Sequence, residues 1–97
     1  MIKVFKMING EELIAKVTGQ TEKEYSVESP SAIMLQQQGE SIGVGLAPYM
    51  PYASDIALQV NAVAAVGTPD VNLENEYNRL FGSGLTIASA STLAGLK

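Results

Sequence analysis

The chain has 97 residues, of which 46% are hydrophobic and 16% are charged, and its formal net charge is −4. This composition is typical of one folded domain with a single modest core, and it excludes an intrinsically disordered chain. The sequence contains no cysteine and no histidine. Disulfides, thiol chemistry, the commonest zinc ligands and the usual general base are therefore excluded, and we expect no enzymatic activity, no metal and no cofactor.

The charged residues are unevenly distributed along the chain. No lysine or arginine lies between Lys23 and Arg79, whereas most of the acidic residues do. Nucleic-acid binding takes most of its affinity from cations that neutralise phosphates. The middle of the chain therefore cannot form a broad basic patch.

The apolar stretches are interrupted too often to form a membrane-spanning helix. The N-terminus also lacks the shape of a signal peptide, because Lys3 and Lys6 lie inside its apolar run. We therefore expect no membrane partner and a cytoplasmic protein. The interrupting residues are Pro48, Pro51, Asp55 and Asn61.

The N-terminal part of the chain predicts a β-hairpin. Two β-rich runs, at about residues 2–8 and 11–18, flank the pair Asn9-Gly10. This pair readily takes the positive φ angles of a two-residue hairpin turn. In the second run every other residue is apolar and lies on the same face of the strand. The residues that share this face are Leu13, Ala15 and Val17.

A third β-rich segment follows the polar turn at residues 19–24. It covers residues 25–28 and resumes at residues 31–36. Pro30 interrupts it and cannot donate a ladder hydrogen bond, so we expect a bend, a bulge or an edge there.

Two more β-rich segments complete the predicted sheet. In residues 42–52, Gly43 and Gly45 suit a sharply curved strand or one closely approached by another backbone. Residues 56–66 form the last segment, with an expected break at Asn61.

The pattern then changes to the period of a helix. Thr68 as N-cap and Pro69 at the first helical position are a typical helix start, and Gly82 is placed to end the helix. The apolar face of this helix consists of Leu73, Tyr77, Leu80 and Phe81. We therefore expect a β domain at residues 1–69, a helix of the same domain at residues 70–82 and a tail of small residues at 83–97.

Five short strands with little helix predict a mainly β fold, a small and strongly bent five-stranded open barrel with a C-terminal helix. An open barrel has unpaired edges, which proteins usually protect with charged side chains or covering elements. Residues 42–54 and 56–69 carry no charge. Either these segments are central, or they pair with another copy, and a repeated contact between different edges closes a ring. The candidate interface residues are Ile42, Val44, Leu46, Ile56, Leu58 and Val60.

Three segments carry small apolar patterns, namely residues 9–17 (NGEELIAKV), 25–30 (YSVESP) and 63–69 (VAAVGTP). Together they resemble the Sm-like (LSm) domain, and in particular the short Sm-like proteins encoded by tailed phages of cyanobacteria. The first segment is similar to the glycine and following strand of the Sm pattern, and the last to the closing strand after the second Sm motif. The resemblance covers roughly residues 2–70.

The resemblance implies a five-stranded bent sheet that assembles into a homo-oligomeric ring by strand pairing and binds single-stranded RNA at its pore or face. The sequence departs from the family pattern at several places. Sm domains begin with a helix, whereas this helix comes last. Residues 29–34 (SPSAIM) lack the Asp and Asn that the family carries around a Met, and no arginine precedes Arg79. No RNA contact is therefore carried over residue by residue.

Two functions remain open. The protein is either a ring-forming RNA-binding protein or RNA chaperone in the cytoplasm of a phage host, or a structural or adaptor ring that binds another protein. Exposed tyrosines can stack bases without much positive charge, or they can seal a barrel end or a subunit contact. The candidate RNA-binding residues are Tyr49, Tyr52, Gln59 and Asn61.

Overall fold

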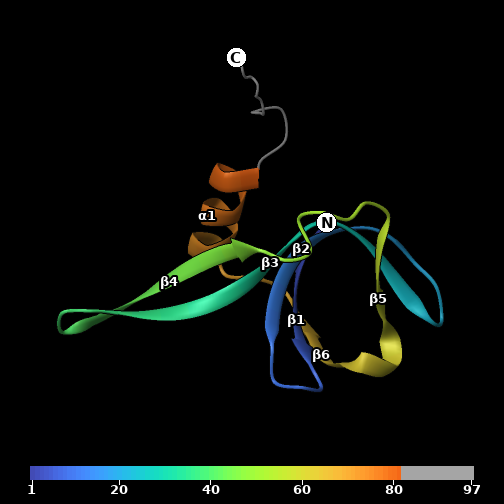
Figure 1. Cartoon of the computed structure of the whole chain (residues 1–97), viewed down its shortest axis with the longest axis horizontal. Coiled ribbons are helices and arrows are strands. Elements are labelled where there is room, and N and C mark those ends of the chain that lie inside the picture. Colours follow the sequence, from blue (N-terminus) through green and yellow to red (C-terminus); the bar gives the residue numbers. More distant parts are fainter. Residues whose placement is uncertain (82–97) are drawn as a thin grey trace, which may run out of the picture.

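The computed structural model describes residues 1–81, which form a mainly β structure with one helix at their end (Figure 1). This confirms the predicted small β fold with a helix after its last strand. The strands are β1 (Ile2–Met7), β2 (Glu12–Gln20), β3 (Glu24–Gln38), β4 (Ser41–Pro48), β5 (Ile56–Gln59) and β6 (Val63–Gly67). A short 3-10 turn, η1 (Val60–Ala62), joins β5 to β6, and the helix is α1 (Val71–Phe81).

All strands belong to one antiparallel sheet with the order β4-β3-β2-β1-β6, and β5 pairs with β3. One edge of β3 carries β2. The other edge carries β5 opposite residues 24–27 and β4 opposite residues 31–38. The strands therefore fill five positions, because β4 and β5 act as one strand interrupted by the loop at residues 49–55.

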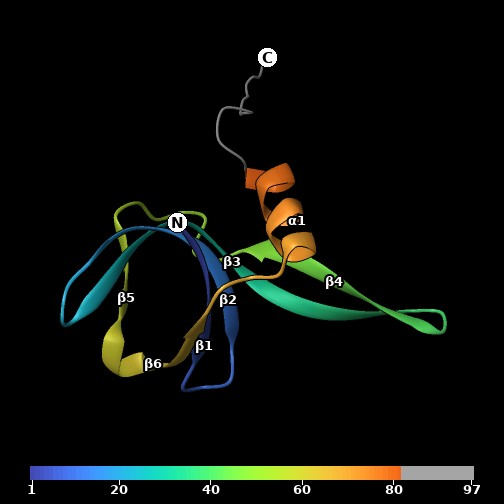
Figure 2. The same cartoon turned by 180° about the vertical axis from the view of Figure 1, so that it is seen from behind.

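The sheet is strongly bent. The turn η1 connects β5, at one end of the sheet, directly to β6 at the other, and it begins at the expected break near Asn61. Hydrogen bonds hold both ends of this turn in place. Val60 N–H donates to Lys23 O (2.8 Å), and Ala62 O accepts from Ile8 N–H (2.9 Å). Figures 1 and 2 show that β1, β2, β5, β6 and the start of β3 curl around the core, while the rest of β3 and β4 project as a ribbon.

The core lies inside this curve. Phe5 is fully buried and meets Tyr25 edge to face, with ring centroids 5.1 Å apart. Leu13 and Ala15 both face the core, which agrees with their predicted shared face, and Ile14 between them faces the opposite side of the sheet. The buried core residues are Phe5, Met7, Leu13, Ala15, Val27 and Leu58.

The turn at Asn9-Gly10 is longer than predicted. Met7 N–H donates to Glu11 O (2.8 Å) and Gly10 N–H donates to Met7 O (2.9 Å), so three residues, 8–10, form the loop. Only Gly10 has a positive φ, of 97°, and the Asn9 side chain instead accepts a hydrogen bond from Glu11 N–H (3.0 Å). A three-residue loop with glycine in the left-handed region is the next commonest hairpin connection after the two-residue turn.

Strand β3 continues through Pro30 as one long strand with a bulge. The register with β2 changes from Ile14 opposite Ser31 to Lys16 opposite Glu28, so two residues of β3 lie opposite one residue of β2. Ser29 takes a φ of 50° at this point. The expected irregularity at Pro30 is therefore a β-bulge, which bends the strand and directs its second half away from the core.

The helix begins at Val71, and its cap lies two residues later than predicted. Its N-cap is Asp70, whose Oδ1 accepts a hydrogen bond from Leu73 N–H at 2.8 Å. Thr68 is not the cap, because its Oγ1 instead accepts a hydrogen bond from Lys3 Nζ at 3.1 Å. Leu80 is 43% exposed, so the apolar face is narrower than predicted. The predicted cap Gly82 and the segment 83–97 lie outside the described residues.

Candidate functional site

The two outer strands of the sheet carry no charged residue. Strand β4 has the sequence SIGVGLAP and β6 has the sequence VAAVG. Within residues 1–81 each of them pairs with a single neighbour, β3 and β1 respectively. Edge strands of monomeric proteins usually carry charges or prolines that prevent pairing with other chains. These two strands contain one such residue, Pro48, at the end of β4. These strands therefore present free, uncharged backbone at opposite ends of the sheet.

The six candidate interface residues fall into two groups. Ile42 and Val44 on β4 are 65% and 47% exposed, and Leu46 on the same strand is half-buried. Leu58 is 5% exposed and packs in the core, so its side chain offers no surface to another chain. Ile56 also packs against the core, and Val60 lies in the turn η1 and not in a strand.

The projecting part of β3 and β4 is a two-stranded ribbon, which we define as residues 31–48. At its base the fully buried Ser31 hydroxyl donates to Ala47 O (2.9 Å). Beyond residue 32 only β4 pairs with β3. Residues directly opposite in an antiparallel pair point to the same face. One face of the ribbon therefore consists almost entirely of apolar side chains, from the opposed pairs Ile33–Leu46, Leu35–Val44 and Gln37–Ile42.

The other face of the ribbon is covered by glutamines. A Cβ placed on Gly45 would lie 2.7 Å from Gln36 Nε2, and a Cβ placed on Gly43 would lie 2.9 Å from Gln38 Nε2. The two glycines therefore leave room for glutamine side chains that lie across the backbone. The sequence predicted a curved strand or the approach of another backbone at these glycines, and it did not identify their glutamine neighbours.

The four candidate RNA-binding residues do not form one site. Tyr49 packs against the core and its hydroxyl donates to Glu11 Oε1 at 3.4 Å. Burial, and then the Glu11 carboxylate, raise the pKa of Tyr49. Tyr52 is 86% exposed in the same loop. Gln59 and Asn61 are exposed at the end of β5 and in η1, at the far end of β5 from this loop (Figure 1).

Three of the lysine and arginine side chains among residues 1–81 donate hydrogen bonds to side-chain oxygen atoms. Lys6 Nζ lies 3.3 Å from Glu12 Oε2, and Arg79 makes two hydrogen bonds to Glu76, the shorter of 2.6 Å. Lys3 donates to Thr68. Two of the six lysines and arginines of the chain are thus paired with carboxylates, which reduces the positive charge that is available to phosphates.

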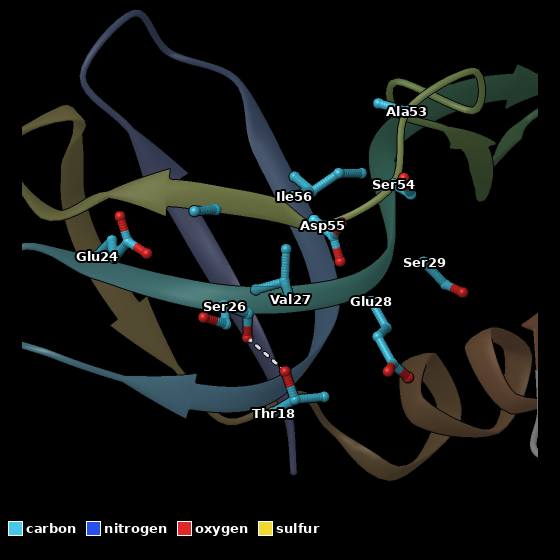
Figure 3. Close-up of a pocket in the computed structure, with 11 residues that line it drawn as sticks. Thr18, Glu24, Ser26, Val27, Glu28, Ser29, Ala53, Ser54, Asp55 and Ile56 are labelled. Atoms are coloured by element: carbon cyan, nitrogen blue, oxygen red, sulfur yellow. Dashed lines mark hydrogen bonds between the residues drawn. The ribbon is translucent and has the colours of Figure 1, made fainter.

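An open groove of about 630 Å³ lies between β2, β3, β5 and the loop that precedes β5 (Figure 3). Hydroxyl groups and carboxylates line it, among them Thr18, Ser26, Glu28, Ser29 and Asp55. Thr18 Oγ1 donates to Ser26 O (3.2 Å). Ser29 and Asp55 both take positive φ angles, of 50° and 55°. Within residues 1–81 no three acidic side chains come close enough to hold a metal ion. The sequence did not predict this groove, because its residues come from distant segments.

Helix α1 packs on the face of the sheet opposite the core. Tyr77 is 3% exposed, and its single hydroxyl hydrogen is shared between Glu28 O (3.1 Å) and Ser29 O (2.9 Å) at the bulge. Burial raises the pKa of Tyr77. The helix is 11 residues long, and no helix in the described part of the chain is long and apolar enough to cross a membrane.

Neither a protein-family model nor a curated protein matches this chain.

Proposed function

We propose that this chain is a non-enzymatic, self-assembling protein of the Sm-like type, whose copies pair through their free sheet edges to form a ring. The observation that carries this proposal is the pair of uncharged outer strands, β4 and β6, at the two ends of one sheet. Pairing of β4 on one copy with β6 on the next uses two different surfaces. Such a contact repeats, and it closes into a ring when the rotation between copies allows.

Two further features support the Sm-like part of the proposal. The sheet has five strand positions and is strongly bent, as the resemblance implies. The segment 63–69, which resembles a closing Sm strand, provides β6 and joins β5 through the tight turn η1. The position of the helix after the sheet remains a departure from the family pattern.

Assembly is tested by sedimentation of the full chain over a range of concentrations. We expect a single closed oligomer. Val66→Lys, on β6, places a charge at the pairing edge and should give a monomer. The matched control is Val71→Lys, since Val71 is also exposed but belongs to α1 and to neither outer strand. A wild-type chain that stays monomeric at all concentrations would contradict the proposal.

The proposed ligand of the ring is single-stranded RNA. Tyr52 supports this proposal because its exposed ring is available for stacking on a base, and each stacked base contributes about 1–3 kcal/mol. Uridine- or adenine-rich oligonucleotides should bind, with an affinity that falls as salt rises. Tyr52→Ala should weaken this binding, whereas Tyr52→Phe should retain it, because phenylalanine keeps the aromatic face.

The alternative is an adaptor ring that binds another protein and no nucleic acid. The net charge of −4 favours it, and so does the pairing of Lys6 and Arg79 with carboxylates. Phosphate contacts are strong at about 50 mM salt. If the oligomer binds none of these oligonucleotides there, the RNA proposal is wrong and the adaptor ring remains as the proposed function.

A further inference from the structure

We propose that the apolar face of the ribbon packs against a second copy of this chain, as a contact additional to the pairing of sheet edges. The proposal rests on the self-assembly proposed above and identifies a second surface that takes part in it. The three most exposed apolar side chains of this face are Leu35, Ile42 and Val44, which are 73%, 65% and 47% exposed.

The two faces of the ribbon differ in how they are covered. Gln36 and Gln38 lie across Gly45 and Gly43 and cover one face with their own side chains. On the other face, Leu35 lies opposite Val44, and their apolar side chains point away from the glutamines into solvent. Contiguous exposed apolar surface on a soluble protein commonly marks an interaction site. Within residues 1–81, one face of the ribbon is therefore covered by its own side chains and the other leaves apolar side chains exposed.

The ribbon also lacks support from its own sheet. From residue 33 outward it has two strands, and a two-stranded ribbon alone is marginally stable in water. A surface packed against its apolar face would add the burial that the sheet does not provide.

Charge favours a second copy as the partner. Residues 31–48 contain one charged residue, Glu40, at the tip, whereas the whole chain has a net charge of −4. Copies with the same net charge repel one another, and an uncharged surface adds no further like-charge repulsion when two copies meet there. A phosphate backbone is disfavoured there, because the ribbon contains no cation. In addition, β4 belongs both to the ribbon and to the free edge, so a copy paired on β4 lies beside the apolar face.

The size of the face indicates that this contact supplements edge pairing and does not replace it. Six residue pairs of the ribbon lie beyond the part of β3 that β2 supports. Such a face is about 20 Å long and about 10 Å wide, or roughly 200 Å², by ordinary strand dimensions. A stable interface buries about 800 Å² per partner. The ribbon contact alone would therefore be too small to hold two copies together.

Because the chain has no cysteine, a single introduced thiol can report on each face. A solvent-sensitive fluorophore on Leu35→Cys should lose its accessibility to iodide quenching as the protein is concentrated and assembles. The matched control is Met34→Cys, the adjacent position on the opposite face, where the side chain is 44% exposed. Its quenching should not change.

A second pair of variants measures the contribution of the contact. Leu35→Gln should raise the concentration at half-assembly by about tenfold or more, since burial of one aliphatic side chain is worth roughly that factor. Met34→Gln should leave it unchanged. If the wild-type chain assembles but both probes stay quenchable and Leu35→Gln assembles normally, this inference is wrong and the ring proposal stands. If the wild-type chain does not assemble, both fail.

Discussion

The Tyr77 hydroxyl donates a hydrogen bond to the carbonyl oxygen of Ser29, 2.9 Å away, at the point where β3 takes a positive φ of 50°. The same hydrogen is shared with Glu28 O, 3.1 Å away. Helix α1 is thus attached to the bulge that directs the ribbon away from the core. The contact links the last described element of the chain to the geometry of the proposed assembly surface.

Removal of this hydroxyl should destabilise the fold. Tyr77→Phe keeps the buried ring but removes the one hydrogen that the two carbonyl oxygens share, and we expect a loss of about 1–2 kcal/mol in the free energy of unfolding. Urea denaturation at one fixed protein concentration measures it, because assembly makes apparent stability depend on concentration. Tyr52→Phe is the control, since Tyr52 is 86% exposed, and it should change the stability little. Equal stability of the two variants would contradict the role of the contact.

The stability of the protein should fall at alkaline pH. Burial raises the pKa of Tyr77 above its ordinary value, so the folded state favours the protonated hydroxyl. The resulting stabilisation is complete below the unfolded pKa of about 10 and is lost as pH rises through the higher folded pKa. Tyr49 contributes in the same direction.

Urea midpoints between about pH 8 and about pH 11 test this dependence, a range that brackets the ordinary tyrosine pKa. The Tyr77→Phe variant should lose less stability over the range than the wild type does. A decline that is just as steep in the variant would show that Tyr77 does not contribute to it.

The two candidate helix caps can be compared directly. Asp70→Ala removes the acceptor for Leu73 N–H and should cost about 1 kcal/mol, with a loss of helical circular dichroism. Thr68→Ala removes only an exposed hydrogen bond with Lys3 and should cost a few tenths of a kcal/mol. A larger effect at Thr68 than at Asp70 would restore the sequence-based assignment of the cap.

The glycines are expected to differ in their tolerance of alanine. Gly10→Ala should cost about 1–2 kcal/mol, because its φ of 97° is unfavourable for a residue with a Cβ. Gly19→Ala is the control, since its φ is not left-handed and an added Cβ meets only Ser26 at 3.8 Å. Its effect on the urea midpoint should be within about 0.5 kcal/mol.

Much of the fold could be predicted because local rules determine it. Alternation placed Leu13 and Ala15 on one face, and Pro30 marked the bulge of β3. Gly10 marked the first turn, although the loop has three residues and not two. Each of these features depends on neighbours within a few positions of the chain.

The candidate surfaces could be predicted only in part. Leu58 and Val44 both lie in uncharged β-rich segments, yet one is buried in the core and the other is 47% exposed on the ribbon. The difference arises from the curvature of the sheet, which folds β5 over the core and leaves the second half of β3 and β4 outside it. Likewise, Thr68 and Asp70 are both good caps, and a contact with Lys3, 65 positions away, engages Thr68.

The amino-acid sequence by itself therefore determined the strand periods, the turns, the uncharged segments and the presence of the final helix, because backbone preferences and side-chain alternation act over short distances. Only the tertiary structure decided which apolar side chains fill the core, which remain on the ribbon and which strand edges stay unpaired within residues 1–81. Those outcomes depend on pairing between strands that are distant in the chain and on the bend that brings β5 and β6 together.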